Sequence, residues 1–216
     1  MTGIRPLQIT EIYCSVQGES SYAGLPCSFI RLTGCPLRCR WCDTVYSFKG
    51  GQELTIEAIV DQVKRFPTRL VEVTGGEPLA QENCKPLIAT LVSEGFKVLL
   101  ETSGSEPITG VDPACHVIMD IKCPDSKMSD RNLWSNIDAL KTTDEIKFVI
   151  ASRADFDWAK AVIEEKSLTR FPLLMSCAWG LVQPKDLTEW ILETGLPCRL
   201  NLQLHKYIWG PRAKGV

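Results

Sequence analysis

The chain has 216 residues, 44% of them hydrophobic and 23% charged, so it can bury one sizeable core, and a single domain over residues 1–216 is expected. Its formal net charge of −2 gives no general basic field, which argues against binding to long nucleic acid. No stretch approaches the roughly 20 apolar residues that cross a bilayer, and the first thirty residues lack the apolar core of a secretion signal. The ten cysteines are therefore expected to be reduced thiols of a cytoplasmic protein with no membrane partner.

Extended segments and helices are predicted to alternate along the chain. Residues 56–66 are expected to form a helix, because their apolar residues recur on one face and Thr55 can cap the first turn. Gly95 is expected to end the next helix. The other elements predicted in this part are strands at 7–16, 27–32 and 69–74, a helix at 86–94, and strands at 97–100 and 116–121.

No crossover helix fits between the strands at 97–100 and 116–121, because Gly104, Pro107 and Pro113 interrupt the connection. The polar insert that follows is expected to hold one amphipathic helix. Such alternation predicts an α/β fold, a partial, modified TIM-like barrel of about six mostly parallel strands with fewer outer helices. The remaining predicted elements are the insert helix at 132–140, a strand at 145–150, a helix through 158–165, a strand at 172–176, a helix at 184–193 and an extended run at 199–204.

Cys35, Cys39 and Cys42 are spaced C-x3-C-x2-C directly after the strand at 27–32. A 4Fe-4S cube has four iron corners and normally takes four cysteine ligands, so three close thiolates would leave one iron open. Zinc is the alternative, but it usually takes a fourth Cys or His at short spacing, and neither His116 nor His205 belongs to a close His pair. The spacing therefore favours an open iron–sulfur cluster as the catalytic centre.

A second motif, Thr74-Gly75-Gly76-Glu77-Pro78, closes the strand at 69–74. Alone, it is equally compatible with a plain turn. Following a cysteine loop in which Trp41 precedes the last cysteine, it resembles the signature of the radical S-adenosylmethionine superfamily. In that superfamily the cofactor's amino and carboxylate groups chelate the open iron. The glycines let backbone approach the ammonium, and Glu77 would accept a hydrogen bond from it.

Polar side chains follow several predicted strands at the point where each strand ends. In parallel barrels the loops at these ends converge over one mouth, where reactive residues gather. Arg31 has two interpretations, because its planar guanidinium could pair with a core carboxylate or hold a substrate carboxylate. The other residues expected at this mouth are Thr74, Gly76, Glu77, Ser103, Lys122 and Ser176.

Several segments together are similar to the 7-carboxy-7-deazaguanine synthase family of that superfamily. The resemblance implies a radical S-adenosylmethionine barrel and a carbon–nitrogen lyase that converts 6-carboxy-5,6,7,8-tetrahydropterin to 7-carboxy-7-deazaguanine with loss of ammonia, in queuosine biosynthesis. It covers almost the whole chain. The segments that carry it are IYCSVQGE (12–19), FIRLTGCPLRC (29–39), WCDT (41–44), TGGEP (74–78), ETSG (101–104) and HKY (205–207).

The resemblance also implies cofactors and partners. The three cysteines would hold one 4Fe-4S cluster per chain, and S-adenosylmethionine would give a 5′-deoxyadenosyl radical that takes hydrogen from C6 of the pterin before the ring contracts. Mg2+ would bind the hydroxyl of Thr44 together with a substrate carboxylate and waters. From sequence alone, a threonine there is more often a turn residue. A flavodoxin or ferredoxin would donate electrons, and the chain would form a homodimer.

The resemblance implies two further sets of residues, which are carried over position by position. Those that would contact the substrate are Val16, Gln17, Gly18, Arg31, Thr74, His205 and Lys206. Those that would contact the cofactor are Trp41, Cys42, Asp43, Gly76, Glu77, Ser103, Asp120, Ile121, Lys122 and Ser176.

Two departures from the family pattern are visible. The tail at 209–216 is longer than in members that end soon after the His-Lys segment, so a contact from a terminal carboxylate cannot be carried over. Asp120-Ile121-Lys122 differs from the Ser-Pro-Lys of some members and resembles glycyl-radical activating enzymes, which are the alternative function. A third possibility is a non-catalytic iron–sulfur or zinc module, which would not need the segment at 75–78.

Overall fold

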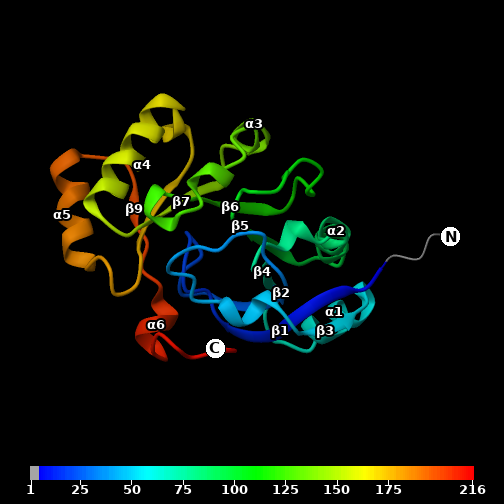
Figure 1. Ribbon diagram of the computed structural model, residues 1–216. Helices are drawn as coiled ribbons and strands as arrows, with labels where there is room; N and C mark the ends of the chain where they lie inside the picture. The colour runs from blue at the N-terminus through cyan, green and yellow to red at the C-terminus, as the bar shows by residue number, and fades with distance from the viewer. Residues whose placement is uncertain (1–4) are drawn as a thin grey trace.

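The structure is a computed structural model that describes residues 5–216, and its strands form one nine-stranded sheet in the order β3-β1-β2-β4-β5-β6-β7-β8-β9 (Figure 1). Neighbouring strands from β2 to β9 are parallel, whereas β1 runs antiparallel to β2 and β3. The strands are β1 (Leu7–Val16), β2 (Pro26–Leu32), β3 (Gln52–Leu54), β4 (Leu70–Gly75), β5 (Lys97–Thr102), β6 (His116–Ile121), β7 (Glu145–Ile150), β8 (Leu173–Cys177) and β9 (Arg199–Leu200).

The predicted partial barrel is confirmed, since the six strands expected between residues 27 and 176 correspond to β2 and β4–β8. β3 and β9 are the two ends of the strand order, so the sheet does not close on itself. β3 has no counterpart among the predicted elements, because three residues are too few for an alternating pattern to stand out. The extended run predicted at 199–204 is wrong beyond β9, because α6 (Leu204–Ile208) begins at its last residue.

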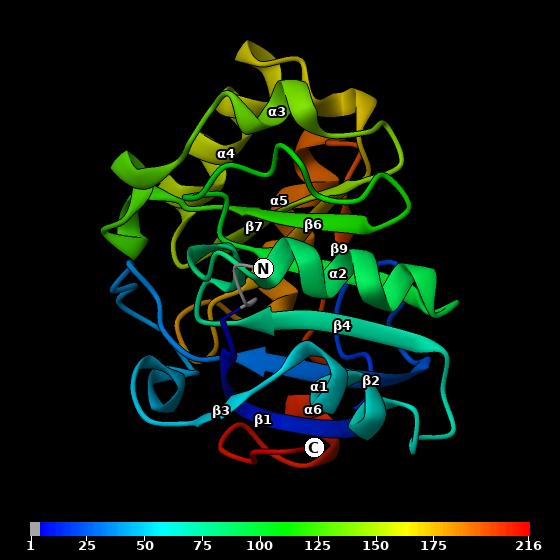
Figure 2. The same ribbon diagram turned by 90° about the vertical axis from the view of Figure 1, so that its right-hand side faces the viewer.

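Helices α1, α2, α4 and α5 pack against the outer face of the sheet (Figures 1 and 2). α1 begins where the Thr55 hydroxyl accepts a hydrogen bond from the N–H of Ala58. α5 ends at Gly195, whose φ of +61° is a conformation that glycine adopts without steric cost. Within the described chain no helix separates β5 from β6, as predicted. The remaining bounds are α1 (Ile56–Val63), α2 (Cys84–Ser93), α3 (Asn136–Ala139), α4 (Arg153–Glu165) and α5 (Pro184–Thr194).

The amphipathic helix predicted at 132–140 is wrong in extent, because only Asn136–Ala139 is helical. The side chain of Asn132 brackets the backbone of Lys122, accepting from its N–H and donating to its C=O, each at 2.9 Å. A side-chain amide that bonds distant backbone competes with the local bonds of a helix. The beginning of the predicted helix is therefore held in a different conformation by the end of β6.

The two faces of the sheet differ in polarity. Along β4, Val71 and Val73 belong to the core between sheet and helices, whereas Glu72 and Thr74 line the inside of the barrel. A small apolar cluster fills the inner face toward the beginnings of the strands, and it consists of Cys27, Phe29, Leu70, Leu99, Ile118 and Leu174. The other half of the interior, near the strand ends, is left to polar side chains.

All ten cysteines of the chain are free thiols in this structure. None of the helices between residues 5 and 216 is both long enough and apolar enough to cross a membrane.

Candidate active site

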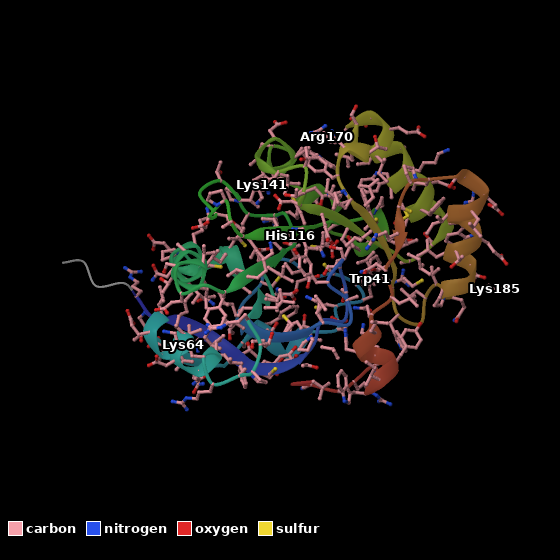
Figure 3. The ribbon with its side chains drawn as sticks, turned by 180° about the vertical axis from the view of Figure 1, so that it is seen from behind. Trp41, Lys64, His116, Lys141, Arg170 and Lys185 are labelled. Atoms are coloured by element: carbon pink, nitrogen blue, oxygen red, sulfur yellow. The ribbon has the colours of Figure 1, made fainter. Side chains whose placement is uncertain are left out.

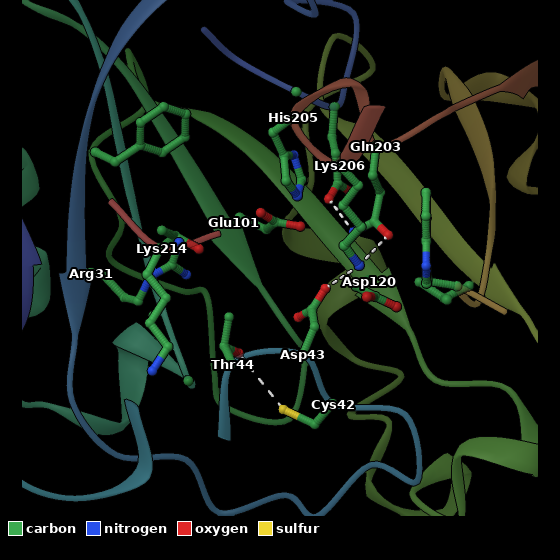
Figure 4. A pocket seen from close by; sticks show the side chains of 18 of the residues that line it. Arg31, Cys42, Asp43, Thr44, Glu101, Asp120, Gln203, His205, Lys206 and Lys214 are labelled. Atoms are coloured by element: carbon green, nitrogen blue, oxygen red, sulfur yellow. Dashed lines mark hydrogen bonds and ion pairs between the residues drawn. The ribbon is translucent and has the colours of Figure 1, made fainter. Parts of the chain in front are cut away.

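A cavity opens at the carboxyl ends of the parallel strands, between the cysteine loop that follows β2 and the C-terminal segment (Figure 4). Seen with all side chains, Trp41 of this loop lies near the middle of the molecule, far from Lys64 and Lys185 at its edges (Figure 3). Most residues predicted to bind cofactor or substrate line the cavity. They are Val16, Gln17, Gly18, Arg31, Cys35, Cys39, Trp41, Cys42, Asp43, Thr44, Thr74, Gly76, Ser103, Asp120, Lys122, His205 and Lys206.

Three residues predicted to contact the cofactor do not line the cavity. Ile121 lies on the outer face of β6, within the main core. Ser176 is buried, and its hydroxyl accepts a hydrogen bond from Asn201 Nδ2 at 2.9 Å. Glu77 is completely buried behind the cavity wall. Cofactor contact by these three side chains stays a prediction, and for Glu77 the structure shows a separate function.

Glu77 ties the glycine motif to the end of β5. Its carboxylate accepts hydrogen bonds from the N–H of Leu79 at 3.0 Å, from the Thr102 hydroxyl at 2.9 Å, and from the N–H and hydroxyl of Ser103 at 2.7 and 2.5 Å. Burial raises the pKa of Glu77, although the bonds from Ser103 and Leu79 act in the opposite direction. The carboxylate therefore orders the backbone of the motif from behind.

The three predicted cluster ligands lie on one loop between β2 and a 3₁₀ turn at Val45–Phe48, and their thiols are partly accessible. Arg38 shapes this loop, because its Nη1 donates to the carbonyls of Cys35 and Leu37 at 2.7 and 2.6 Å. Among residues 5–216, no three His, Cys, Asp or Glu side chains are grouped so that they could share one metal ion. A cubane binds each thiolate at a separate iron corner, so its ligands need not converge on one ion.

Gly75 and Gly76 bring the end of β4 against the cysteine loop. A Cβ on Gly76 would lie 2.3 Å from the carbonyl oxygen of Gly34 and 2.6 Å from Cys35 Cβ. Gly75 has a φ of +151°, and a Cβ there would meet the carbonyl oxygen of Leu32 at 2.3 Å. Only glycine fits at these two positions. The pair therefore presents backbone without side chains beside the thiol of Cys35.

A belt of buried and half-buried charged side chains crosses the inner face of the sheet. Lys147 on β7 donates to Glu19 at 2.8 Å and contacts Glu101 of β5, while Lys122 donates to Asp120 on β6 at 2.8 Å. Burial lowers the pKa of Lys147, but the carboxylates of Glu101 and Glu19 raise it well above the usual value. Lys147 therefore stays an ammonium in the barrel interior.

The C-terminal segment closes one side of the cavity (Figure 4). The Nζ of Lys206 donates to Asp43 at 2.5 Å and to Gln203 at 2.6 Å. Gly18 lies so close to His205 that a Cβ on it would be 2.2 Å from the Nδ1 of that histidine. Two predicted substrate-contacting segments from opposite ends of the chain thus lie directly against each other.

Arg31 meets a carboxylate of the protein and still lines the cavity. Its Nε donates to Glu11 at 2.7 Å, and its Nη2 donates to the hydroxyl of Tyr13 at 3.0 Å. The Nη1 group has no hydrogen bond to another residue in the described chain, so it is available to an anionic ligand. Both interpretations of Arg31 from the sequence are therefore compatible, with the core carboxylate fixing the guanidinium.

The tail also lines the cavity, through residues between Gly210 and Val216. Figure 4 shows Lys214 beside Arg31, and the Nζ of Lys214 lies 4.3 Å from the centre of the Tyr46 ring. Nothing in the composition of this glycine-containing tail predicts that placement.

Sequence reasoning also missed three charged residues of the interior: Glu72, Glu101 and Lys147. The amino-acid sequence does contain a signal for these three residues. Glu72 and Lys147 each stand between apolar neighbours in a predicted strand, as in VEV and IKF, and Glu101 directly follows the strand predicted at 97–100. In a strand, alternate positions face opposite sides, so a charge within an apolar run indicates a polar inner face.

Residues 29–117 match the family described as the radical SAM superfamily. The chain is 46% identical to the 7-carboxy-7-deazaguanine synthase of Koribacter versatilis, over 97% of this chain and 100% of the relative, and 46% identical to that of Chlorobaculum tepidum, over 98% of each. The crystal structure of QueE from Escherichia coli has the same fold, with a TM-score of 0.76 and 24% identity over 93% of this chain and 95% of that one. With near full-length similarity of this degree, the chain belongs to the 7-carboxy-7-deazaguanine synthase family of the radical SAM superfamily.

Proposed function

We propose that this chain, as a single radical SAM core domain, carries out the reaction for which its family is named. It would convert 6-carboxy-5,6,7,8-tetrahydropterin to 7-carboxy-7-deazaguanine with release of ammonia, on the route to queuosine. The observation that carries this proposal is one cavity in which three thiols, a backbone edge that admits only glycine, and the Nη1 face of Arg31 converge. The similarity to two synthases named for this product supports the substrate class.

Enzymes of the radical SAM superfamily use a 4Fe-4S cluster and S-adenosylmethionine. Cys35, Cys39 and Cys42 would hold the cluster, and the backbone at Gly76 would receive the methionine end of the cofactor, because no side chain obstructs that edge. When bound, this pair supplies a carbon-centred radical that can take hydrogen from the substrate. Trp41 lines the adjoining part of the cavity, where the adenosyl group would lie.

The protein's part in the reaction is to position the substrate and exclude water. Glu11 and Tyr13 hold the guanidinium of Arg31 in place before a ligand arrives, so little side-chain freedom is lost when its Nη1 binds a carboxylate. Lys206, fixed by Asp43, keeps α6 over the cavity. A covered site protects a reactive intermediate from solvent.

Mg2+ belongs to this proposal, at Thr44. The Oγ1 of Thr44 belongs to the cavity wall, and its polar contact is the Sγ of Cys42 at 3.7 Å, which is at most a weak hydrogen bond. The hydroxyl oxygen is therefore available to a cation. Mg2+ prefers oxygen ligands and keeps several waters, so one threonine with a substrate carboxylate suits it.

Two partners complete the proposal, an electron donor and a second copy of the chain. The donor would be an acidic flavodoxin or ferredoxin, and the exposed Arg38 and Arg40 on the cysteine loop support its docking there. The homodimer is supported by Tyr207 and Ile208 of α6, whose apolar side chains are more than half exposed. The free cysteines support a reducing, cytoplasmic setting.

An anaerobic assay tests the function. Protein reconstituted with iron and sulfide is incubated with 6-carboxytetrahydropterin, S-adenosylmethionine, reductant and Mg2+, and the products are identified by mass and absorbance. A deazapurine that accumulates over many turnovers is expected. Deoxyadenosine without the deazapurine would contradict the proposed substrate, and hydrogen loss from a labelled glycine of a partner protein would indicate an activating enzyme instead. Absence of deoxyadenosine from cluster-loaded protein would point to a non-catalytic module.

A further inference from the structure

We infer that Glu72, together with Gln17, contacts the polar edge of the substrate ring and determines which heterocycle the cavity accepts. The inference rests on the proposed function, because it takes a pterin as the ligand. Glu72 lies in the middle of β4, two residues before Thr74, and both side chains face the cavity. Its exposed fraction is 3%, so the carboxyl forms part of the deep wall.

Glu72 differs from the neighbouring carboxylates because, within residues 5–216, it forms no ion pair with a cationic side chain. Glu19 and Glu101 both contact the ammonium of Lys147, whereas Glu72 forms no ion pair within residues 5–216 and is bonded to the side-chain amide of Gln17. Burial raises the pKa of Glu72 well above the usual range, and the nearby carboxylates of Glu101 and Glu19 add to that effect while Gln17 and Lys147 oppose it. Before a ligand binds, its surroundings therefore favour the protonated, neutral form of Glu72.

Gln17 is held in a defined orientation. Its Oε1 accepts a hydrogen bond from the N–H of Glu19 at 3.1 Å, which directs Nε2 toward Glu72. Its backbone is bonded at 2.8 Å to the carbonyl of Leu25 and to the N–H of Gly24. An amide nitrogen carries two hydrogens, so one goes to Glu72 and the second remains for a ligand. Gln17 and Glu72 thus form one rigid polar pair.

An aromatic wall stands beside this pair. Phe29 of β2 is the register partner of Glu72, and Tyr13 stacks on it with ring centres 5.0 Å apart and planes inclined by 13°. Both rings line the cavity. A flat heterocycle lying against them turns its edge toward Glu72. Arg31 follows Phe29 by two residues on the same face, about 7 Å nearer the mouth, so a carboxylate at the far end of the ring would meet its guanidinium.

The 2-amino-4-oxo edge of a pterin carries a ring N–H and an amino group side by side. A carboxylate can accept both hydrogens at once, and such charge-assisted pairs are stronger than neutral ones. The proton held by Glu72 before binding then passes to solvent as the N–H donors stabilise the anion. A ring with oxygen in place of the amino group turns a lone pair toward this site. It can pair only with the protonated acid, through weaker neutral hydrogen bonds, and is therefore disfavoured.

The test uses anaerobic, cluster-loaded protein and compares wild type with Glu72→Gln. Binding of 6-carboxytetrahydropterin is measured by calorimetry at pH 7 in two buffers of different ionisation enthalpy, which counts protons released. Wild type is expected to release about one proton per ligand, as linkage requires of a group that ionises on binding, and Glu72→Gln none. The KM of Glu72→Gln for the pterin is expected to rise about 10- to 100-fold, with kcat changed by less than about threefold.

The second measurement is discrimination between the pterin and its 2-oxo analogue, which is expected to shrink about 10-fold or more in Glu72→Gln. Glu72→Asp keeps a carboxyl group but moves it away from the ligand. This variant should therefore release the proton and bind the pterin more weakly, and it replaces Glu72→Gln in the test if that variant does not fold. Glu53→Gln, on the exposed edge strand β3, is the matched control. Equal proton release, KM and discrimination in Glu72→Gln and wild type would overturn the inference. Wild type that binds the pterin without converting it would count against the proposed function, and the proton count would still decide the role of Glu72.

Discussion

Lys206 of α6 and Asp43 of the cysteine loop form an ion pair of 2.5 Å between residues 163 positions apart in the sequence. The Lys206 side chain is 6% exposed and that of Asp43 is 42% exposed, so the pair lies at the rim of the cavity. Because Asp43 directly follows Cys42, the contact couples the C-terminal segment to a predicted cluster ligand.

Replacement of Lys206 by methionine is expected to raise the KM for the pterin several-fold and to lower the melting temperature by only a few degrees. A hydrogen bond to a charged group contributes about 1.5–3 kcal/mol, and the exposure of Asp43 reduces this toward the lower end. Steady-state kinetics of Lys206→Met and Lys185→Met, a control on α5 at the edge of the molecule (Figure 3), check the expectation. An unchanged KM in Lys206→Met would mean that α6 does not hold the substrate.

Replacement of Glu77 by glutamine separates two roles for this residue. If Glu77 orders the glycine motif, the variant should lose about 2–4 kcal/mol of unfolding free energy, because an amide cannot accept from all the donors that surround the carboxylate. Its affinity for S-adenosylmethionine should then change little in the folded fraction. Urea unfolding and equilibrium binding distinguish the roles. Weak cofactor binding with unchanged stability would instead support the direct contact with the ammonium that the sequence predicts.

Replacement of Cys39 by alanine is expected to abolish turnover without unfolding the barrel, because the thiol is partly exposed and lies on a loop outside the core. Iron content after reconstitution should fall, while far-ultraviolet circular dichroism stays like that of wild type. Cys198→Ala is the matched control, a partly exposed thiol away from the cysteine loop. Product formation by a cluster-free sample of Cys39→Ala would contradict the assignment.

Replacement of Thr44 by valine is expected to remove the stimulation of activity by Mg2+, since the side chain keeps its shape and loses its oxygen. Thr44→Ser should retain that stimulation. Titration of activity with Mg2+ in EDTA-treated protein compares the three proteins. If valine leaves the Mg2+ dependence intact, the cation binds elsewhere in the cavity.

Stability should depend on pH through Glu19. Burial raises the pKa of its carboxyl, but the ammonium of Lys147 more than offsets this, so the pKa in the folded protein lies below the usual value. A group of this kind stabilises the fold above its unfolded pKa of about 4.3, and that contribution is lost as pH falls toward the lower folded pKa. Glu19→Gln should therefore be less stable than wild type at pH 7, with a difference that shrinks below about pH 4. Urea unfolding at several pH values tests this, and a constant difference would be inconsistent with it.

Local chemistry determined most of the elements and the main motifs. Thr55 and Gly195 mark helix ends through bonds and conformations that involve only nearby residues. The alternation of apolar strands and helices indicated a parallel sheet, because parallel neighbours need a long crossover connection, usually a helix. The C-x3-C-x2-C spacing determined that Cys35, Cys39 and Cys42 share one loop.

Only the tertiary structure decided which partner each polar side chain takes. Alternation along β4 places Glu72 inside the barrel, but whether Glu72 meets a cation depends on the neighbouring strands. In the structure Lys147 pairs with Glu19 and Glu101, and Glu72 is hydrogen-bonded to Gln17. In the same way, the side chain of Asn132 is hydrogen-bonded to the backbone of Lys122, ten positions earlier, and this part of the predicted helix is not helical. The physical reason is that the energy of a buried charge or amide depends on groups brought near by folding, which no short window of sequence contains.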